Sequence, residues 1–211
     1  MSIHLGTSGW HYRHWIGRFY PTGLRSDDWL AHYARHFSCV EINNSFYRLP
    51  SVENVDTWLQ QAPVDFSFTL KASRYITHMK KLKDAAAPLA ELLKLARAFE
   101  DRLGAILFQL PPSWHIDAIF RLLGRHRVAF CQFDLAGFAS PSTVTAGLVY
   151  VRLHGPDAAY TGIYTDRELR VWADRIKAWD ADGRDVYVFF DNDQEAGAVH
   201  DAFALQHLLN A

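Results

Sequence analysis

The chain has 211 residues, of which 49% are hydrophobic and 21% are charged, and its formal net charge is −1. This length suits one large domain, and the apolar content can supply a core, which excludes a disordered chain. The nearly neutral charge excludes a global attraction to nucleic acid or to an anionic membrane, and no apolar run reaches the ~18 residues that a membrane span requires.

Cysteine usage and the start of the sequence predict a cytoplasmic protein. Cys39 and Cys131 both lie in apolar, strand-like runs and show no CxxC spacing, which is typical of reduced, packed thiols. The first residues run directly into a strand-like segment, without the charged and apolar regions of a secretion signal. We therefore expect a cytoplasmic location and no membrane partner.

Short strand-like runs alternate along the chain with amphipathic helical segments, a pattern typical of a parallel sheet. Strands are expected at Ile3–Ser8, Cys39–Asn43, Phe66–Lys71, Ala105–Leu110, Val128–Asp134, Leu148–His154 and Asp185–Asp191. Helices are expected near Asp27–His36, Val52–Gln61, Ala85–Asp101, Asp117–Arg125, Asp166–Ala181 and Glu195–Leu209. With no Ser/Gly linker in sight, the pattern predicts a single domain over residues 1–211.

Two of these helices carry a clear apolar stripe at helical spacing. The stripes consist of Leu89, Leu92, Leu93, Ala96 and Phe99, and of Leu169, Trp172, Ala173, Ile176 and Trp179. Thr165 and Glu168 form a capping box at the start of the second helix. We expect both stripes to pack in a helical layer against the outward-facing Phe66, Phe68 and Leu70.

The alternation within the strands favours a (β/α) barrel of the TIM type. In Phe66–Lys71 the large apolar residues share one face, whereas Ser67, Thr69 and Lys71 share the other. Both faces of an open sheet covered by helices should be apolar, whereas a barrel interior admits polar groups at its ends. Polar side chains gather near the carboxyl ends of the strands, where barrel enzymes place their sites. A doubly wound sheet with polar strand ends is the alternative.

Several motifs in this order resemble the YecE-like family of unknown function. They are Gly6–Tyr12 with Trp15, Gly17 and Phe19–Pro21, then Glu41–Pro50, Lys71 with Ile76–His78, Leu107–Pro112, Tyr150–Gly155 and Phe190–Asp193. The resemblance runs essentially from end to end. It implies a TIM-barrel fold and a site at the strand ends, and it implies no particular reaction.

One departure from the family's pattern lies between Pro112 and Val128. Family members carry another strand there, with an acidic-aromatic-arginine motif and a Ser-Trp pair, whereas Ser113–Arg127 leaves room for one helix only. Because seven strands are expected rather than eight, we predict an incomplete or distorted barrel with an internal deletion between about residues 112 and 128. An open seam there would favour self-association.

Four residues near the strand ends are the candidate catalytic groups: Glu41, Lys71, Arg152 and His154. Glu41 and Lys71 could act as a base with an electrostatic partner, or form a structural buried pair. Arg152 suits a phosphate or carboxylate, and His154 suits proton transfer. Their structural alternative is an arginine paired with Glu41 or Asp191 and a histidine bound to backbone. The candidate substrate-binding residues are Ser8, Trp10, Tyr12, Asn43, Tyr47, Arg48, His78, Gln109, Asp191 and Asn192.

The sequence predicts neither a cofactor nor a metal. Glu41, His78, Asp134, His154 and Asp191 could supply metal ligands, but no HxH or HExxH spacing connects them. Gly6–Gly9 lacks both the phosphate-binding lysine motif and the GxGxxG spacing, and Ser8 lacks a GxSxG elbow.

Two classes of function remain open. The first is an enzyme, or a degenerate enzyme, that acts on a small polar or anionic substrate at the carboxyl ends of the strands. The second is a non-catalytic ligand-binding or RNA-binding protein that uses the aromatic and basic side chains of the Trp10–Tyr20 segment. Burial of those rings as a lid over the site is the plainer interpretation of that segment.

Overall fold

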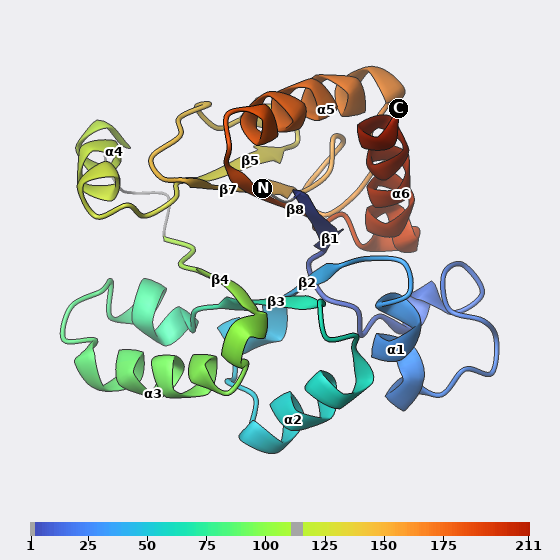
Figure 1. The fold of residues 1–211 in the computed structure, drawn as a ribbon, viewed down its shortest axis with the longest axis horizontal. Coiled ribbons are helices and arrows are strands. Elements are labelled where there is room, and N and C mark those ends of the chain that lie inside the picture. The colour runs from blue at the N-terminus through green and yellow to red at the C-terminus, as the bar shows by residue number, and fades with distance from the viewer. Residues whose placement is uncertain (1–2, 111–115) are drawn as a thin grey trace. The chain divides into compact units, whose positions relative to one another are not determined.

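The structure is a computed structural model that describes residues 3–110 and 116–211, with the backbone alone at 116–119. The chain forms a mixed α/β fold (Figure 1). Its strands are β1 (Ile3–Thr7), β2 (Cys39–Ile42), β3 (Ser67–Lys71), β4 (Leu103–Leu107), β5 (Cys131–Leu135), β6 (Phe138–Ala139), β7 (Leu148–Leu153) and β8 (Asp185–Phe190).

The helices fall close to the predicted segments. The α-helices are α1 (Trp29–Tyr33), α2 (Val52–Gln61), α3 (Ala86–Arg97), α4 (Ile116–Arg125), α5 (Asp166–Ala181) and α6 (Gly197–Asn210). Short 3₁₀ turns are η1 (Arg13–Trp15), η2 (Ser26–Asp28), η3 (Asn43–Phe46), η5 (Glu100–Arg102) and η6 (Gln194–Ala196), and η4 (Tyr75–Met79) is a π-helix. The predicted capping box is confirmed, because the Thr165 side chain accepts from the Glu168 amide and Glu168 binds back to Thr165.

The strands pair into two sheets, with the orders β1-β8-β7-β5-β6 and β2-β3-β4. Pairing is parallel throughout except for the short hairpin of β5 and β6. Parallel α/β architecture is confirmed, and all seven expected strands are present. Within the described residues the sheets do not close into a barrel, and β6 is a strand beyond the seven expected. The incomplete or distorted barrel stays a prediction. Which strands pair across a sheet depends on contacts between distant segments, which residue alternation does not specify.

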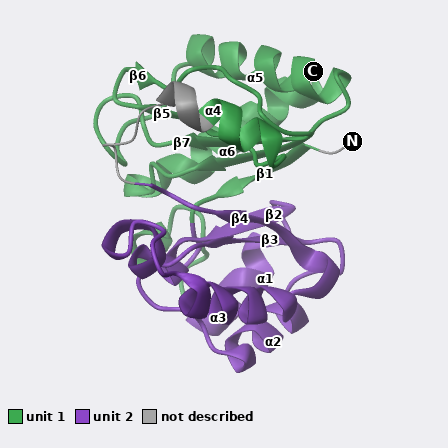
Figure 2. Cartoon of the chain, turned by 90° about the vertical axis from the view of Figure 1, so that its left-hand side faces the viewer, with its two compact units in different colours: residues 1–8, 12–23, 115–211 green, residues 9–11, 24–114 purple. Residues whose placement is uncertain are grey.

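The chain divides into two compact units (Figure 2). Unit 1 comprises residues 1–8, 12–23 and 115–211, and unit 2 comprises residues 9–11 and 24–114. Each sheet therefore has its own unit, with the five-stranded sheet in unit 1 and the three-stranded sheet in unit 2.

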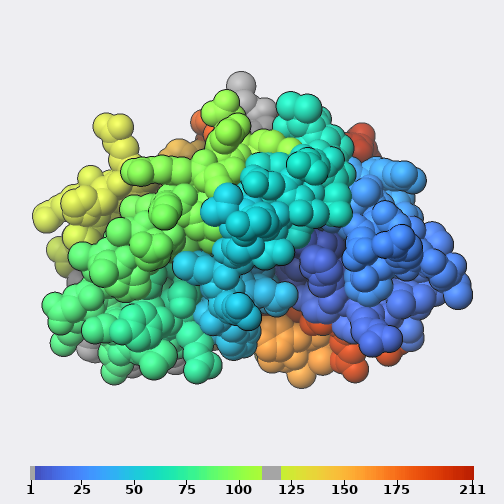
Figure 3. Space-filling view, turned by 90° about the horizontal axis from the view of Figure 1, so that it is seen from below, coloured from blue at the N-terminus to red at the C-terminus, as the bar shows by residue number. Residues whose placement is uncertain are grey.

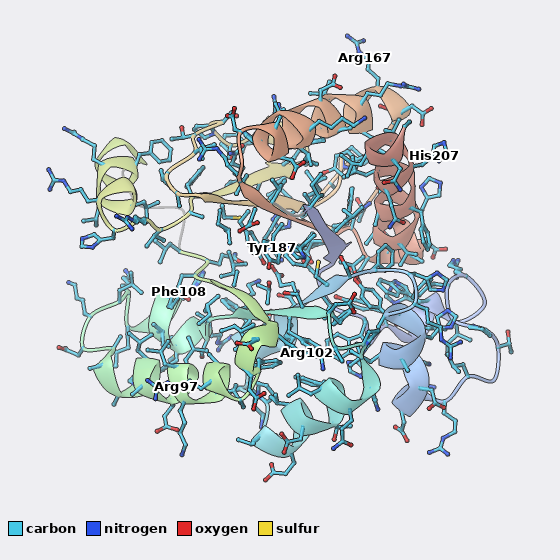
Figure 4. All side chains as sticks on the ribbon, viewed as in Figure 1. Arg97, Arg102, Phe108, Arg167, Tyr187 and His207 are labelled. Carbon is cyan, nitrogen blue, oxygen red and sulfur yellow. The ribbon has the colours of Figure 1, made fainter. Side chains whose placement is uncertain are left out.

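One face of the unit 1 sheet carries rings low on the strands and polar groups at their carboxyl ends. His4 stacks on Tyr187, labelled in Figure 4, with ring centroids 4.2 Å apart, and Tyr187 stacks on Tyr150 at 6.5 Å. Burial lowers the pKa of His4, which favours its neutral form. The strand register places Ser8, Asp191, Arg152 and His154 further along this same face.

The predicted stripe of α5 is confirmed as core. Its five residues Leu169, Trp172, Ala173, Ile176 and Trp179 are buried, while Arg167 on the opposite side points away from the helix into solvent (Figure 4). The 3.6-residue period of the sequence thus separates the two sides of the helix.

The unit 2 core is aromatic. Phe68 packs between Phe66 and Phe99, with ring centroids at 5.0 and 5.3 Å, and Tyr33 lies at 6.2 Å from Phe66. On the face seen in Figure 3, the cyan and green atoms of this unit include those of α2 and α3. The α3 stripe is confirmed at Leu92, Ala96 and Phe99 but is wrong at Leu93, which is 41% exposed.

Arg102 joins α2 to the start of β3 (Figure 4). Its guanidinium donates to the carbonyls of Leu59, Ala62 and Phe66 at 2.7, 3.2 and 3.1 Å, and lies over the Phe68 ring. Two of these carbonyls belong to the end of α2, where helical carbonyls lack helical partners.

The predicted bounds differ most from those observed at two strands. Strand β4 ends at Leu107, so that Phe108–Leu110 lie beyond it, and β5 begins at Cys131 rather than Val128. Among the described helices, none has both the length and the apolar content needed to cross a membrane.

Candidate functional site

A cluster of four polar side chains lies at the carboxyl ends of β1, β7 and β8 in unit 1. We call Ser8, Arg152, His154 and Asp191 the arginine–histidine cluster. Asp191 Oδ2 accepts from Arg152 Nη2 and pairs with His154 Nδ1, both at 2.9 Å. Arg152 Nη2 also donates to Ser8 Oγ at 3.2 Å, and Arg152 Nη1 lies 3.4 Å from His154 Nε2.

The backbone holds each member of this cluster in place. Arg152 and His154 are two residues apart on β7 and its end, so they project from one face. The Asp191 amide donates to the Leu153 carbonyl and the Ser8 amide donates to the Phe190 carbonyl, which continues the ladder beyond the strand ends. The Tyr12 hydroxyl donates to the Ser8 carbonyl at 2.6 Å.

Burial and pairing define the chemistry of the arginine–histidine cluster. The side chains of Arg152 and Asp191 are each 4% exposed, and that of His154 is 12% exposed. A carboxylate that accepts from Nδ1 fixes the imidazole tautomer and leaves a lone pair on Nε2. His154 Nε2 is therefore a proton-accepting atom beside a guanidinium that can hold negative charge.

A second buried carboxylate supports the loops around this cluster. Asp201 Oδ2 accepts from the Tyr164 amide at 3.1 Å and from Asn192 Nδ2 at 2.8 Å. Burial raises the pKa of Asp201, while hydrogen bonds from His200, Tyr164 and Asn192 lower it. Asn192 Nδ2 also donates to the Gly162 carbonyl, so this predicted substrate-binding residue acts within the protein as a loop tether.

A separate polar group lies in unit 2 at the ends of β2 and β3. Lys71 Nζ donates to Asn43 Oδ1 at 2.9 Å and lies 4.6 Å from the centroid of the Phe46 ring. Ser45 Oγ lies 2.6 Å from the carbonyl oxygens of both Ile42 and Lys71, can donate its one proton to either, and accepts from the Lys71 amide at 3.0 Å, which ties the two strand ends together. Ser45 lies in the Glu41–Pro50 motif, but nothing in the sequence indicates that its hydroxyl connects the ends of β2 and β3.

Glu41 and His78 lie near the same group. Glu41 is fully buried on β2, opposite Thr69 in the register and therefore on the face that carries Lys71. Burial raises the pKa of the Cys39 thiol, and the charge of Glu41 raises it further. His78 Nδ1 lies 2.9 Å from Thr77 Oγ1, and its ring packs edge-on against Phe46 at 5.2 Å.

The remaining predicted residues fall into two classes. Trp10 is buried in unit 2 against Trp58, whereas Tyr47 is 71% exposed and Arg48 is also exposed. Gln109 was expected to end the fourth strand; it lies beyond β4 and is exposed, so that assignment is wrong. Phe108–Leu110 continue the apolar pattern of β4, but residues past Leu107 do not pair with β3.

The Trp10–Tyr20 segment does not present an exposed aromatic strip. Trp15 and Tyr20 are 0% and 1% exposed within unit 1. Trp15 Nε1 and His14 Nε2 both contact the Asp193 carbonyl, at 3.0 and 2.8 Å, and Arg18 pairs with Glu195. These contacts hold the segment against η6. Its buried rings therefore do not support the hypothesis that this segment binds RNA.

Across the described side chains, no three His, Cys, Asp or Glu residues converge as a metal site would require. The five candidate ligands are distributed over both units: Asp134, His154 and Asp191 in unit 1, Glu41 and His78 in unit 2. The convergence of Glu41 and Lys71 with Arg152 and His154 in one concavity stays a prediction.

The family model described as "Protein of unknown function DUF72" matches residues 4–121 and 113–211. The chain belongs to the DUF72 family. This confirms the resemblance found in the motifs. The two matched stretches of DUF72 sequence overlap at residues 113–121, within the region of the suspected deletion.

Two DUF72 relatives align with about half of the chain. YecE of Escherichia coli is 33% identical over 112 residues, which cover 53% of this chain and 39% of YecE. YunF of Bacillus subtilis is 28% identical over 116 residues, which cover 52% of this chain and 40% of YunF. The alignments thus span about two fifths of the length of these curated relatives.

Two solved DUF72 structures share the fold. A DUF72 family protein from Thermotoga maritima aligns with a TM-score of 0.89 and 24% identity over 100% of both chains. One from Enterococcus faecalis aligns with a TM-score of 0.73 and 19% identity, over 99% of this chain and 98% of its own. At these identities the likeness concerns architecture.

Proposed function

We propose that the chain is an enzyme that binds a small anionic substrate at the arginine–histidine cluster and moves a proton with His154. The observation that carries this proposal is the shared acceptor Asp191 Oδ2, which receives both Arg152 Nη2 and His154 Nδ1. A purely structural ion pair would need only the arginine and the carboxylate. Here the carboxylate also orients an imidazole whose other nitrogen lies beside Arg152 Nη1.

The chemical step follows from this geometry. A proton leaves the bound substrate for His154 Nε2, and the resulting imidazolium is stabilised by the Asp191 carboxylate at Nδ1. The negative charge left on the substrate is held by the Arg152 guanidinium, which is buried and therefore acts in a low dielectric. Ser8 Oγ, bound to Arg152 Nη2, adds a hydroxyl that can orient the substrate.

Binding is tested with inorganic phosphate and methyl phosphate, following the His154 imidazole protons by NMR. The wild-type shifts should move and saturate. Arg152→Lys keeps the buried charge but removes the two-pronged donor, so its affinity should fall. Arg184→Lys is the matched control, because Arg184 donates to the Ala146 carbonyl in the same unit. Unshifted wild-type resonances up to saturating salt would reject the anion site.

Turnover is tested on any anion that binds, in the same NMR tube. His154→Gln should retain binding and lose turnover, because glutamine can donate to Asp191 but cannot accept a proton at neutral pH. A His154→Gln protein that turns substrate over at the wild-type rate would reject the role of His154. Catalytic roles for Glu41 and Lys71, which lie in unit 2, stay proposals of their own.

A non-catalytic function in nucleic-acid binding has one specific observation in its favour. Unit 2 exposes two tyrosines beside cations: Arg74 lies 5.9 Å from the Tyr47 ring, and Lys80 lies 5.8 Å from the Tyr75 ring. Tyr47 and Tyr75 are 71% and 44% exposed. Exposed rings with neighbouring cations suit single-stranded nucleic acid. Affinity for a labelled oligonucleotide should fall with salt and with Tyr47→Ala if this second function holds.

We also propose that the chain lacks one strand–helix unit between about residues 112 and 128. In support, α4 is followed directly by β5, and the two matched family stretches meet in this region. In the described residues β4 has β3 as its one strand neighbour, and such an edge favours self-association. Inserting a strand–helix unit after Asp117 should raise the melting temperature and reduce self-association measured by ultracentrifugation. We also propose a cytoplasmic location for this protein.

A further inference from the structure

Three aromatic rings extend from the imidazole of His154. We call Phe133, Phe138 and Tyr160 the aromatic wall. Phe133 and Tyr160 lie 6.2 and 5.8 Å from His154, at interplanar angles of 78° and 76°, and Phe138 lies 5.8 Å from Phe133. Phe138 and Tyr160 are 58% and 50% exposed. The rings therefore combine contact with His154 and access to solvent.

The backbone of Tyr160 is in an unfavourable conformation. Its φ is +68°, in the left-handed region that glycine and asparagine adopt most readily. Its amide donates to the His154 carbonyl at 2.7 Å, which holds this conformation against the end of β7. A bulky residue at positive φ is uncommon, and such strain gathers at functional sites.

Two glycines allow the loop to bring Tyr160 to this place. Gly155 has φ +110°, and a Cβ there would lie 2.1 Å from the Thr161 carbonyl oxygen. Gly162 has φ +87°, and a Cβ there would lie 2.5 Å from Asp157 Oδ2. Gly155 has no room for a side chain because the contact is with backbone, whereas at Gly162 the Asp157 side chain would have to move. The loop is thus closed tightly against Gly155.

The other rings come from the β5–β6 hairpin, which is joined to the same loop. The hairpin turns at Ala136 and Gly137, both at positive φ, and pairs Leu135 with Phe138. The Ala136 amide donates to the Gly155 carbonyl at 2.9 Å. The two elements that carry the aromatic wall are therefore fixed to each other by backbone.

We propose that the aromatic wall binds a planar ring in the substrate whose anionic group is held by the arginine–histidine cluster. This inference rests on the proposed anion site and narrows its substrate class to anions that carry a flat ring, such as aryl phosphates. Contact of a planar ring with an aromatic side chain contributes ~1–3 kcal/mol, which is about 5- to 150-fold in affinity. Arg152 and His154 supply the charge recognition, and the wall supplies the discrimination between ring-bearing and ringless anions.

The test compares phenyl phosphate with methyl phosphate, which carry the same charge with and without a ring. Dissociation constants come from the His154 imidazole shifts. The wild type should bind phenyl phosphate at least about 5-fold more tightly. Tyr160→Ala should remove most of that preference and leave the affinity for methyl phosphate unchanged. Tyr160→Phe should retain it. Phe203→Ala, which removes a partly exposed ring of unit 1 on α6, is the matched control and should match the wild type.

A second variant keeps the test valid if Tyr160→Ala folds poorly. Tyr160→Gly removes the ring and suits the positive φ, so it should fold and show the same loss of preference. Equal affinity of the wild type for the two compounds, or full preference in both ring-deleted variants, would overturn the aromatic wall. Methyl phosphate binding that still depends on Arg152 would in that case leave the anion site standing. Failure of both compounds to bind would overturn both proposals.

Discussion

Arg102 should be the most important single hydrogen-bonding side chain for the stability of unit 2. It serves three backbone carbonyls, those of Leu59, Ala62 and Phe66, from three different nitrogens. A hydrogen bond from a charged donor contributes ~1.5–3 kcal/mol when buried. Arg102 is half-buried, so water replaces part of each bond, and we expect Arg102→Ala to lower the free energy of unfolding by ~2–4 kcal/mol.

Lysine cannot replace this arginine. An ammonium reaches one or two of three divergent carbonyls, and it lacks the planar group that lies over Phe68. Arg102→Lys should therefore recover ~1 kcal/mol of the loss. Urea denaturation followed by tryptophan fluorescence reports on unit 2 through Trp10, Trp29 and Trp58. Arg97→Ala, on the exposed side of α3, is the control and should stay within ~0.5 kcal/mol of the wild type. Equal midpoints for Arg102→Ala and Arg97→Ala would refute the reasoning.

Three further predictions concern the core, the thiols and a buried carboxyl. Trp172→Ala should cost ~3–5 kcal/mol, because Trp172 is 5% exposed, and an unchanged denaturant midpoint would show that it is not core. Native-state alkylation followed by mass spectrometry should modify the half-buried Cys131 before Cys39, whose burial excludes reagent and raises its pKa; the reverse order would contradict this. Burial raises the pKa of Asp201, so the folded state binds its proton more tightly and this group adds stability as pH falls from neutral toward ~4. The free energy of unfolding of Asp201→Asn, measured relative to wild type, should therefore decrease as the pH is lowered across that range. A difference that does not change with pH would show that Asp201 is not the cause.

The strands of this fold could be predicted because alternation has a period of two residues whatever the strands pair with. The same alternation placed Arg152 and His154 on one face, and their joint contact with Asp191 follows from the parallel register of β7 and β8. Pairing of the strands into two sheets could not be predicted, since it depends on segments far apart in the chain. Phe108–Leu110 show the same limit: their pattern continues β4, yet pairing stops at Leu107.

The missed residues share a physical reason. The position of the Tyr160 ring depends on a left-handed backbone conformation. In the sequence, only the flanking glycines indicate that this loop has an unusual backbone. Arg102 and Asp201 act on backbone groups of distant segments, and the sequence shows each as an ordinary charge in or near a helix. The Trp10–Tyr20 segment is rich in basic residues that suggest exposure, but Trp15 and Tyr20 are buried and Trp15 binds the distant Asp193 carbonyl.

The pairing of β1 with β8 sets the order in which this protein can fold during synthesis. β1 is synthesised before all of unit 2, whereas its partner residues follow unit 2, as Val186 opposite Ile3 shows. At ~5–20 residues per second, the first strand waits roughly 10–40 s for its neighbour. Unit 2 is nearly continuous in the chain and can be complete in that time. The nascent protein therefore carries β1 unpaired ahead of a folded unit, and a chaperone that holds β1 would protect the slowest step.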